Sequence, residues 1–351
     1  MTNVTSPSAA APATRTLATT GAGAPVAARR GGGFEGTVTV LTRQTVADGV
    51  VSLELAPRFG DDGPLPSWQP GAHIDVVLPT GVTRQYSLCG PAKDTARWRI
   101  AVLREPDGRG GSQWIHDNVH EGSELRVRGP RNNFPLHTTP KYLFVGGGIG
   151  ITPLLPMIEE AEAAEAEWSL LYGGRTRTSM AFLPELERYG DRVTVRPQDE
   201  HGLLDLASFL GDPDPPTLVY CCGPAGLIDA VEAYCATWPA GTLNVERFAA
   251  ADRQSPTGSE AGRQPFEMEL RASGVTLTVP PELSVLKAVE QAGVPVMSSC
   301  EEGICGSCET AVLEGEVDHR DSLLTEDERA ANDTMLICVS RARSGRLVLD
   351  L

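Results

Sequence analysis

The chain has 351 residues, of which 41% are hydrophobic, and a formal net charge of −16. This length predicts two or three domains, each with enough apolar residues for a core. The acidic balance argues against nucleic acid or an anionic membrane surface as a partner, and no apolar run approaches the ~20 residues of a membrane span.

Residues 1–33 are rich in Ala, Thr, Gly and Pro and contain no acidic residue. Such a segment could be an organellar transit peptide. It has no clear amphipathic stripe, however, so we expect a disordered tail.

Residues 34–137 are predicted to form an antiparallel Greek-key β-barrel. Short alternating or β-branched runs are separated by Gly, Pro and Asp turns, as is typical of small barrels. The predicted strands are Gly36–Leu41, Val50–Leu55, His73–Leu78, Gln85–Leu88, Trp98–Leu103 and Glu124–Val127.

Two short motifs on this barrel suggest a flavin site. In the first, Arg84 can bind a phosphate bidentately, while Tyr86 offers a flat face and Ser87 a hydroxyl for a ring. The second is a glycine loop that includes Gly111 and Ser112 and opens a short helix, which makes a ready anion site. Each motif alone also fits an ordinary strand or turn, but together they predict a flavin phosphate site.

Residues 138–248 change to alternating strands and helices, which predicts an open, mostly parallel α/β sheet with a ligand crevice at the strand C-ends. The strand Tyr142–Val145 runs into Gly147, Gly148 and Gly150, and Thr152 is predicted to cap the next helix. Strand, glycine loop and helix form a typical phosphate-binding arrangement. Cys222 ends a later strand and is either a buried thiol or part of the crevice.

Residues 249–264 are predicted to be a linker, and residues 265–351 the last domain. A hairpin (Phe266–Leu270 with Val275–Val279), a helix (Leu283–Gln291), a strand (Thr310–Val317), a capping box at Thr325 and a final strand (Arg346–Leu351) resemble the β-grasp ferredoxin fold.

This last domain carries Cys300, Cys305 and Cys308 at C-x4-C-x2-C spacing, with Cys338 further on. That is the plant-type spacing for a 2Fe–2S cluster. A zinc site is the alternative, but such sites usually present two C-x2-C pairs. The remaining cysteines, Cys89, Cys221, Cys222 and Cys235, have no disulfide-framework spacing, which favours a reducing cytoplasm.

The order of these motifs resembles the phthalate dioxygenase reductase family over residues 34–351. The resemblance implies an NADH-dependent enzyme that reduces an oxygenase through FMN and a 2Fe–2S cluster. Arg84, Tyr86 and Ser87 would hold FMN, with Gly111 and Ser112 near its phosphate. Gly147 to Thr152 would bind the NADH pyrophosphate, Cys222 would flank the nicotinamide, and Phe248 would shield the flavin.

The chemistry then belongs to the cofactors, so we nominate no catalytic side chain. We expect a monomer whose acceptor is a Rieske non-haem iron oxygenase, or alternatively a haem-thiolate monooxygenase. A flavohaemoprotein-like scavenger would need a haem domain, and a redox sensor would need an output domain. Glu301 and Glu302 beside the cysteines suggest an electrostatic docking face for the oxygenase. Asp199 and Glu200 favour NADH over NADPH, whereas Arg175 and Arg177 argue for the reverse.

Overall fold

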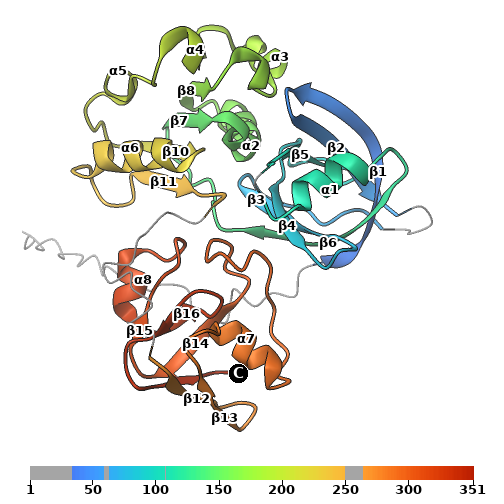
Figure 1. Ribbon diagram of the computed structural model, residues 1–351. Coiled ribbons are helices and arrows are strands. Elements are labelled where there is room, and N and C mark those ends of the chain that lie inside the picture. The colour runs from blue at the N-terminus through green and yellow to red at the C-terminus, as the bar shows by residue number, and fades with distance from the viewer. Residues whose placement is uncertain (1–33, 59–62, 107, 250–263) are drawn as a thin grey trace, which may run out of the picture. The chain divides into compact units, whose positions relative to one another are not determined.

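The computed structural model describes residues 34–58, 63–106, 108–249 and 264–351. The predicted tail 1–33 and nearly all of the predicted linker 249–264 lie outside these ranges. The described residues form three larger sheets, coloured blue to green, green to yellow and orange to red along the chain in Figure 1.

The first sheet is antiparallel, with strand order β4-β3-β6-β1-β2-β5. It curls as predicted, because the edge strands β4 and β5 contact each other and the Cys89 amide donates to the Arg99 carbonyl at 2.8 Å. The elements are β1 (Phe34–Ala47), β2 (Val50–Pro57), β3 (Ala72–Val77), β4 (Thr83–Ser87), β5 (Trp98–Leu103), α1 (Gly111–Asn118) and β6 (Glu124–Asn132).

The second sheet is parallel, with strand order β11-β10-β7-β8-β9. Its strands are β7 (Lys141–Gly147), β8 (Glu167–Gly174), β9 (Val193–Pro197), β10 (Thr217–Cys222) and β11 (Leu243–Glu246). Its α-helices are α2 (Ile151–Ala163), α3 (Leu183–Leu186), α4 (Gln198–His201), α5 (Leu206–Leu210) and α6 (Ala225–Cys235), and its short 3-10 turns are Gly148–Gly150, Arg177–Ser179 and Glu187–Arg192.

Side-chain alternation along β7 explains why this sheet is covered on both faces. Tyr142 and Phe144 pack with α2 in one core, whereas Leu143 and Val145 pack with α5 and α6 in another. Successive side chains of a strand point to opposite faces. The continuous apolar run is therefore that of a doubly covered parallel strand, as predicted.

The third sheet has strand order β13-β12-β18-β14-β16. Strands β15 and β17, from the same part of the chain, form a separate two-stranded ribbon. The elements are β12 (Phe266–Leu270), β13 (Val275–Val279), α7 (Val285–Gln291), β14 (Glu309–Glu314), β15 (Val317–Asp318), α8 (Glu326–Ala331), β16 (Thr334–Leu336), β17 (Arg341–Ala342) and β18 (Arg346–Leu349). The predicted hairpin is present, and so is the capping box at Thr325.

The predicted helix cap at Thr152 is wrong. A 3-10 turn at Gly148–Gly150 runs directly into α2, so Gly150 is the capping residue. The Thr152 hydroxyl donates instead to the Ile149 carbonyl at 2.9 Å. Two helices of this sheet are short, since α3 has four residues and α5 has five. Among the described residues, no helix is long and apolar enough to cross a membrane.

Candidate functional site

The loop that carries the first three cysteines requires two left-handed glycines. Gly303 and Gly306 have φ of 72° and 71°. A Cβ on Gly303 would lie 2.6 Å from Val339 Cγ2 and 3.0 Å from Asp321 Cα. Glycine is therefore needed there both for conformation and for space.

The four cysteines of the motif are buried and unbridged, and they meet in two pairs. Cys300 lies within hydrogen-bonding reach of Cys305, and Cys308 within reach of Cys338. Hydrogen bonding from Cys300 lowers the pKa of Cys305, and hydrogen bonding from Cys308 lowers the pKa of Cys338. In each pair, one thiol is therefore disposed to ionise.

Backbone amides of the loop point at these sulfurs. The Glu302 amide donates to Cys300 Sγ at 3.3 Å and the Ser307 amide to Cys305 Sγ at 3.4 Å. Two thiol pairs surrounded by N–H donors suit two irons with two thiolates each. Among the residues with described positions, no three His, Cys, Asp or Glu side chains are grouped around a single point.

The barrel brings two guanidinium groups together at the start of α1. A Cβ on Gly111 would lie 2.7 Å from Arg84 Cγ and 2.9 Å from Arg84 Nε, so Arg84 packs directly on the glycine loop. Burial, and then the neighbouring charge of Arg109, lowers the pKa of Arg84. Like charges held together at a helix N-terminus favour an anion between them.

Tyr86 and Ser112 lie in the same part of the barrel. Burial raises the pKa of Tyr86, and its buried hydroxyl has no hydrogen-bond partner among the described residues. The Ser112 hydroxyl accepts the Glu105 amide at 3.0 Å, which leaves its own O–H available to donate. An unsatisfied phenol beside a cationic glycine loop fits a ligand with both a ring and a phosphate.

The glycines at the end of β7 and just after it are needed for different physical reasons. A Cβ on Gly150 would lie 2.3 Å from the Cys222 carbonyl oxygen, and one on Gly147 would lie 2.7 Å from Pro224 Cδ, so both allow close packing against the end of β10. Gly148 instead has a φ of 54° and open space beside it. Tyr172 fixes this loop by donating to the Gly148 carbonyl at 3.1 Å.

Glu246 is a residue that the sequence analysis missed. It ends β11 directly opposite Cys222, which ends β10, and it accepts a hydrogen bond from Ser87 of the barrel. Its Oε2 is buried without a partner among the described residues. Burial raises the pKa of Glu246 to about 8, so it holds a proton at neutral pH. In the sequence, Glu246 lies between the predicted site residues Cys222 and Phe248, and this position was the available clue.

The residues predicted to lie against the nicotinamide and the flavin differ in exposure. Cys222 is fully buried, and burial, with Glu246 beside it, raises the pKa of its thiol. Phe248 is 39% exposed, although it is a large apolar residue. Farther along the sheet edge, Arg177 forms an ion pair with Glu200 at 3.4 Å, so the charges of these two side chains offset each other.

The two acids beside the cysteines are engaged within the chain. Glu302 Oε1 lies 2.7 Å from Arg109 Nη2 of the barrel. Glu301 Oε1 lies 3.1 Å from Lys287 Nζ of α7. The sequence could not reveal either ion pair, and both weigh against the expectation that these acids await an external partner.

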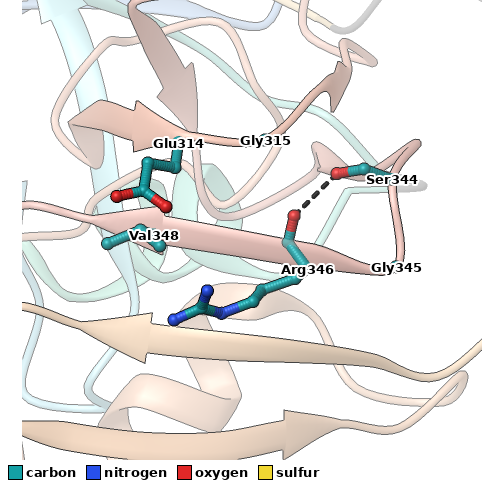
Figure 2. Close-up of a pocket in the computed structure, with 6 residues that line it drawn as sticks. All are labelled: Glu314, Gly315, Ser344, Gly345, Arg346 and Val348. Atoms are coloured by element: carbon teal, nitrogen blue, oxygen red, sulfur yellow. Dashed lines mark hydrogen bonds between the residues drawn. The ribbon is translucent and has the colours of Figure 1, made fainter.

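A separate depression of about 430 Å³ lies on the third sheet. Figure 2 shows its lining, in which the Ser344 hydroxyl donates to the Arg346 carbonyl at 2.6 Å. The Arg346 guanidinium is already paired with Glu267 and Glu269. The depression contains none of the predicted site residues, so we assign it no function.

Two family models match the chain. Residues 268–343 match the 2Fe-2S iron-sulfur cluster binding domain, and residues 144–233 match the oxidoreductase NAD-binding domain. The phthalate dioxygenase reductase of Burkholderia cepacia is 38% identical over 318 residues, which cover 89% of this chain and 96% of that protein. The chain belongs to the phthalate dioxygenase reductase family. It is accordingly an NADH-dependent oxidoreductase with FMN and a 2Fe–2S cluster, and it serves as an oxygenase reductase component.

Further relatives agree with this family. Phenoxybenzoate dioxygenase subunit beta of Ectopseudomonas oleovorans is 41% identical over 307 residues, covering 87% of this chain and 94% of that protein. The solved phthalate dioxygenase reductase has a TM-score of 0.67 at 37% identity, covering 90% of this chain and 98% of that one. The reductase family fold is thus matched over nearly the whole length of both chains.

A second solved structure is an intact type IV self-sufficient cytochrome P450 monooxygenase. It has a TM-score of 0.82 and 44% identity over 90% of this chain. This chain spans about two fifths of the length of that monooxygenase, since the match covers 41% of it.

Proposed function

We propose that the protein passes electrons from NADH through FMN and the 2Fe–2S cluster to a Rieske non-haem iron oxygenase. The observation that carries this proposal is the position of Arg109. Its guanidinium adjoins Arg84 of the anion site and also donates to the carbonyl of Cys300 at 2.7 Å. One side chain therefore spans the flavin phosphate site and the cysteine loop.

In this proposal the barrel holds FMN. Arg84 binds the phosphate, with the backbone at Gly111 and the Ser112 hydroxyl beside it. Tyr86 directs its unsatisfied hydroxyl to the flavin, and Ser87 lies near the ring. The support is the guanidinium pair, the missing Cβ at Gly111 and the orphaned phenol.

The parallel sheet would hold NADH at its strand C-ends. Gly148 offers open backbone to the pyrophosphate at the N-terminus of α2, while Gly147, Gly150 and Thr152 shape that turn. Cys222 flanks the nicotinamide, and the exposed ring of Phe248 covers the flavin.

Cys300, Cys305, Cys308 and Cys338 hold the cluster, two thiolates to each iron. When bound, the three groups supply the redox chemistry: two electrons arrive together from NADH and leave singly through the cluster. The protein contributes binding and orientation, and Glu246 retains a proton beside the crevice.

A haem-thiolate monooxygenase is the second candidate acceptor. It is favoured by the 44% identity with the self-sufficient P450 monooxygenase, which exceeds the 38% identity with the Burkholderia reductase.

Reconstitution distinguishes the two acceptors. Purified protein would be mixed with NADH and either a Rieske oxygenase or a P450, and product formation followed with both. We expect turnover with the Rieske enzyme. Turnover with the P450 alone would establish the second candidate, and failure to reduce cytochrome c with NADH would overturn the reductase assignment altogether.

Two further measurements test the cofactors. Chromatography of the acid-released flavin should give FMN, because the glycine loop suits a terminal phosphate. The kcat/KM for NADH should exceed that for NADPH, because Asp199 disfavours a 2′-phosphate, whereas the charge of Glu200 is offset by Arg177; a preference for NADPH would contradict this.

The proposal also includes the organisation of the chain. The FMN domain spans residues 34–137, the NAD domain 138–248 and the ferredoxin domain 265–351, and the protein acts as a cytoplasmic monomer. Size-exclusion chromatography with light scattering tests the monomer.

A further inference from the structure

The antiparallel sheet and the cysteine loop are joined by hydrogen bonds from three separate parts of the barrel. Ser299 Oγ of the loop donates to Asp75 Oδ1 of the barrel at 2.8 Å. From the barrel, Arg109 Nη2 donates to the Cys300 carbonyl at 2.7 Å and Asn133 Nδ2 donates to the Cys305 carbonyl at 2.9 Å. All three contacts fall on residues that carry or precede the first pair of cysteines. The barrel thus contacts the loop where the Cys300–Cys305 pair is built.

Asp75 is an unusual residue for the middle of a barrel strand. It lies on β3 and is only 1% exposed. Its Oδ1 accepts hydrogen bonds from Arg131 at 2.7 Å, Gln85 at 3.1 Å and Ser299. Burial alone would raise the pKa of Asp75, but Arg131, Gln85 and Ser299 together lower it below its usual value. A buried carboxylate is tolerated only when it is well hydrogen-bonded, and one of its three donors comes from the cysteine loop.

Arg109 adds a charged contact beside this buried one. Besides donating to the Cys300 carbonyl, it forms the ion pair with Glu302. Both side chains are more than a third exposed, so this pair orients the loop more than it stabilises the fold. Arg109 also adjoins Arg84, so the same residue borders the flavin phosphate site.

We propose that Asp75, Arg109 and Asn133 form a polar clamp that positions the cysteine loop on the FMN-binding barrel for electron transfer to the cluster. The three are positioning residues, since they contact the loop rather than the reacting groups. The proposal rests on the proposed electron path from FMN to the cluster. It also gives Glu302 a role within the chain, as the ion-pair partner of Arg109, in place of a role in docking the oxygenase.

The test uses the full-length holoprotein with isosteric or near-isosteric changes on the two contacts that lie outside the phosphate site. Asn133→Asp removes the N–H donor to Cys305, and Ser299→Ala removes the hydroxyl donor to Asp75. Ser299→Thr keeps a hydroxyl and should restore the wild-type behaviour. The matched control is Asn118→Asp with Ser344→Ala, because Asn118 and Ser344 donate to carbonyls away from the clamp.

Amide hydrogen exchange of residues 296–309 is the first readout, and it does not depend on activity. Each lost hydrogen bond should accelerate exchange about fivefold, and the double variant about 25-fold. Exchange in β7 and the visible circular dichroism of the cluster should stay as in the wild type, which shows that the variants fold and bind the cluster. Unchanged exchange at 296–309 would overturn the clamp.

The second readout is the rate at which NADH reduces the cluster, measured by stopped-flow absorbance, with ferricyanide reduction as the reference. The variants whose loop amides exchange fastest should show the slowest reduction of the cluster. The rate of ferricyanide reduction should be the same in all variants. Faster exchange with unchanged cluster reduction would overturn the positioning role. If the wild-type protein passes no electrons from NADH to its cluster, the proposed function fails, and the exchange experiment still decides whether the contacts hold the loop.

Discussion

Two adjacent residues, Asn133 and Phe134, serve two very different interfaces of the barrel. Asn133 reaches the cysteine loop with one hydrogen bond. Phe134 is buried against Tyr220 of the parallel sheet, with ring centroids 5.4 Å apart, and it belongs to a core that also contains Val50 of the barrel and Met157 of α2. The barrel therefore shares an apolar core with the NAD-binding sheet, but it meets the cluster loop through polar groups.

This difference indicates how each interface is used. A shared apolar core is permanent, because separating it would expose the buried surface to water. Polar contacts cost less to break, since water replaces the lost partners. We infer that the flavin and nicotinamide sites stay joined through the catalytic cycle, whereas the cluster-bearing domain is held on the barrel by polar contacts.

The largest expected effect comes from removing the cluster-bearing domain. A chain ending at residue 255 should still reduce ferricyanide with NADH, because the barrel and parallel sheet share one core. Its cytochrome c reduction should fall to background, because the one-electron outlet is gone. Comparing both activities with those of the full-length protein is the measurement, and a truncated chain that fails to fold would contradict the comparison.

The next effect is on stability at the apolar interface. Phe134→Ala should lower the free energy of unfolding by about 3–5 kcal/mol through loss of packing and the cavity left behind. Asn133→Ala should cost only about 1 kcal/mol. Urea unfolding followed by flavin fluorescence measures both, and equal losses from the two variants would show that the interfaces do not differ.

A smaller effect is expected at the polar edge of the same interface. Arg99 of β5 donates to Glu185 of α3 from its two terminal guanidinium nitrogens at 2.7 and 3.0 Å and lies over the Phe182 ring. Arg99→Met should lower the free energy of unfolding by about 1–2 kcal/mol, since Glu185 is partly exposed. Arg104→Met, which loses the exposed pair with Asp117, is the control and should cost less.

A separate effect, seen only as pH changes, is the pH dependence that Glu246 contributes where barrel and sheet meet. Because burial raises the pKa of Glu246 from 4.5 to about 8, its contribution to stability is complete below pH 4.5 and is lost as pH rises to 8. Glu246→Gln should flatten the stability profile between pH 5 and 9, measured by urea unfolding across this window. Identical profiles for wild type and variant would show that the carboxyl ionises normally.

The sequence by itself determined most of the cluster-bearing domain, although the strand predicted over Thr310–Val317 ends at Glu314. Its cysteine spacing, the hairpin and the capping box are local features, and each is found where it was predicted. The alternation in β7 and the curled barrel were also predictable, because hydrophobic periodicity reports which faces are buried. Helix starts were less predictable: Thr152 has the chemistry of a cap, yet the 3-10 turn before it makes Gly150 the capping residue and places Thr152 inside the helix.

Only the tertiary structure decided what the charged and polar residues do. In the sequence, Glu302 lies next to the cysteines with no evident partner. In the structure it forms an ion pair with Arg109, nearly two hundred residues away. Asp75 and Glu246 carry no motif, and their importance comes from burial and from partners on other elements. Periodicity and spacing are properties of a short segment, whereas a pKa or an ion pair depends on every group that folding brings within a few ångströms.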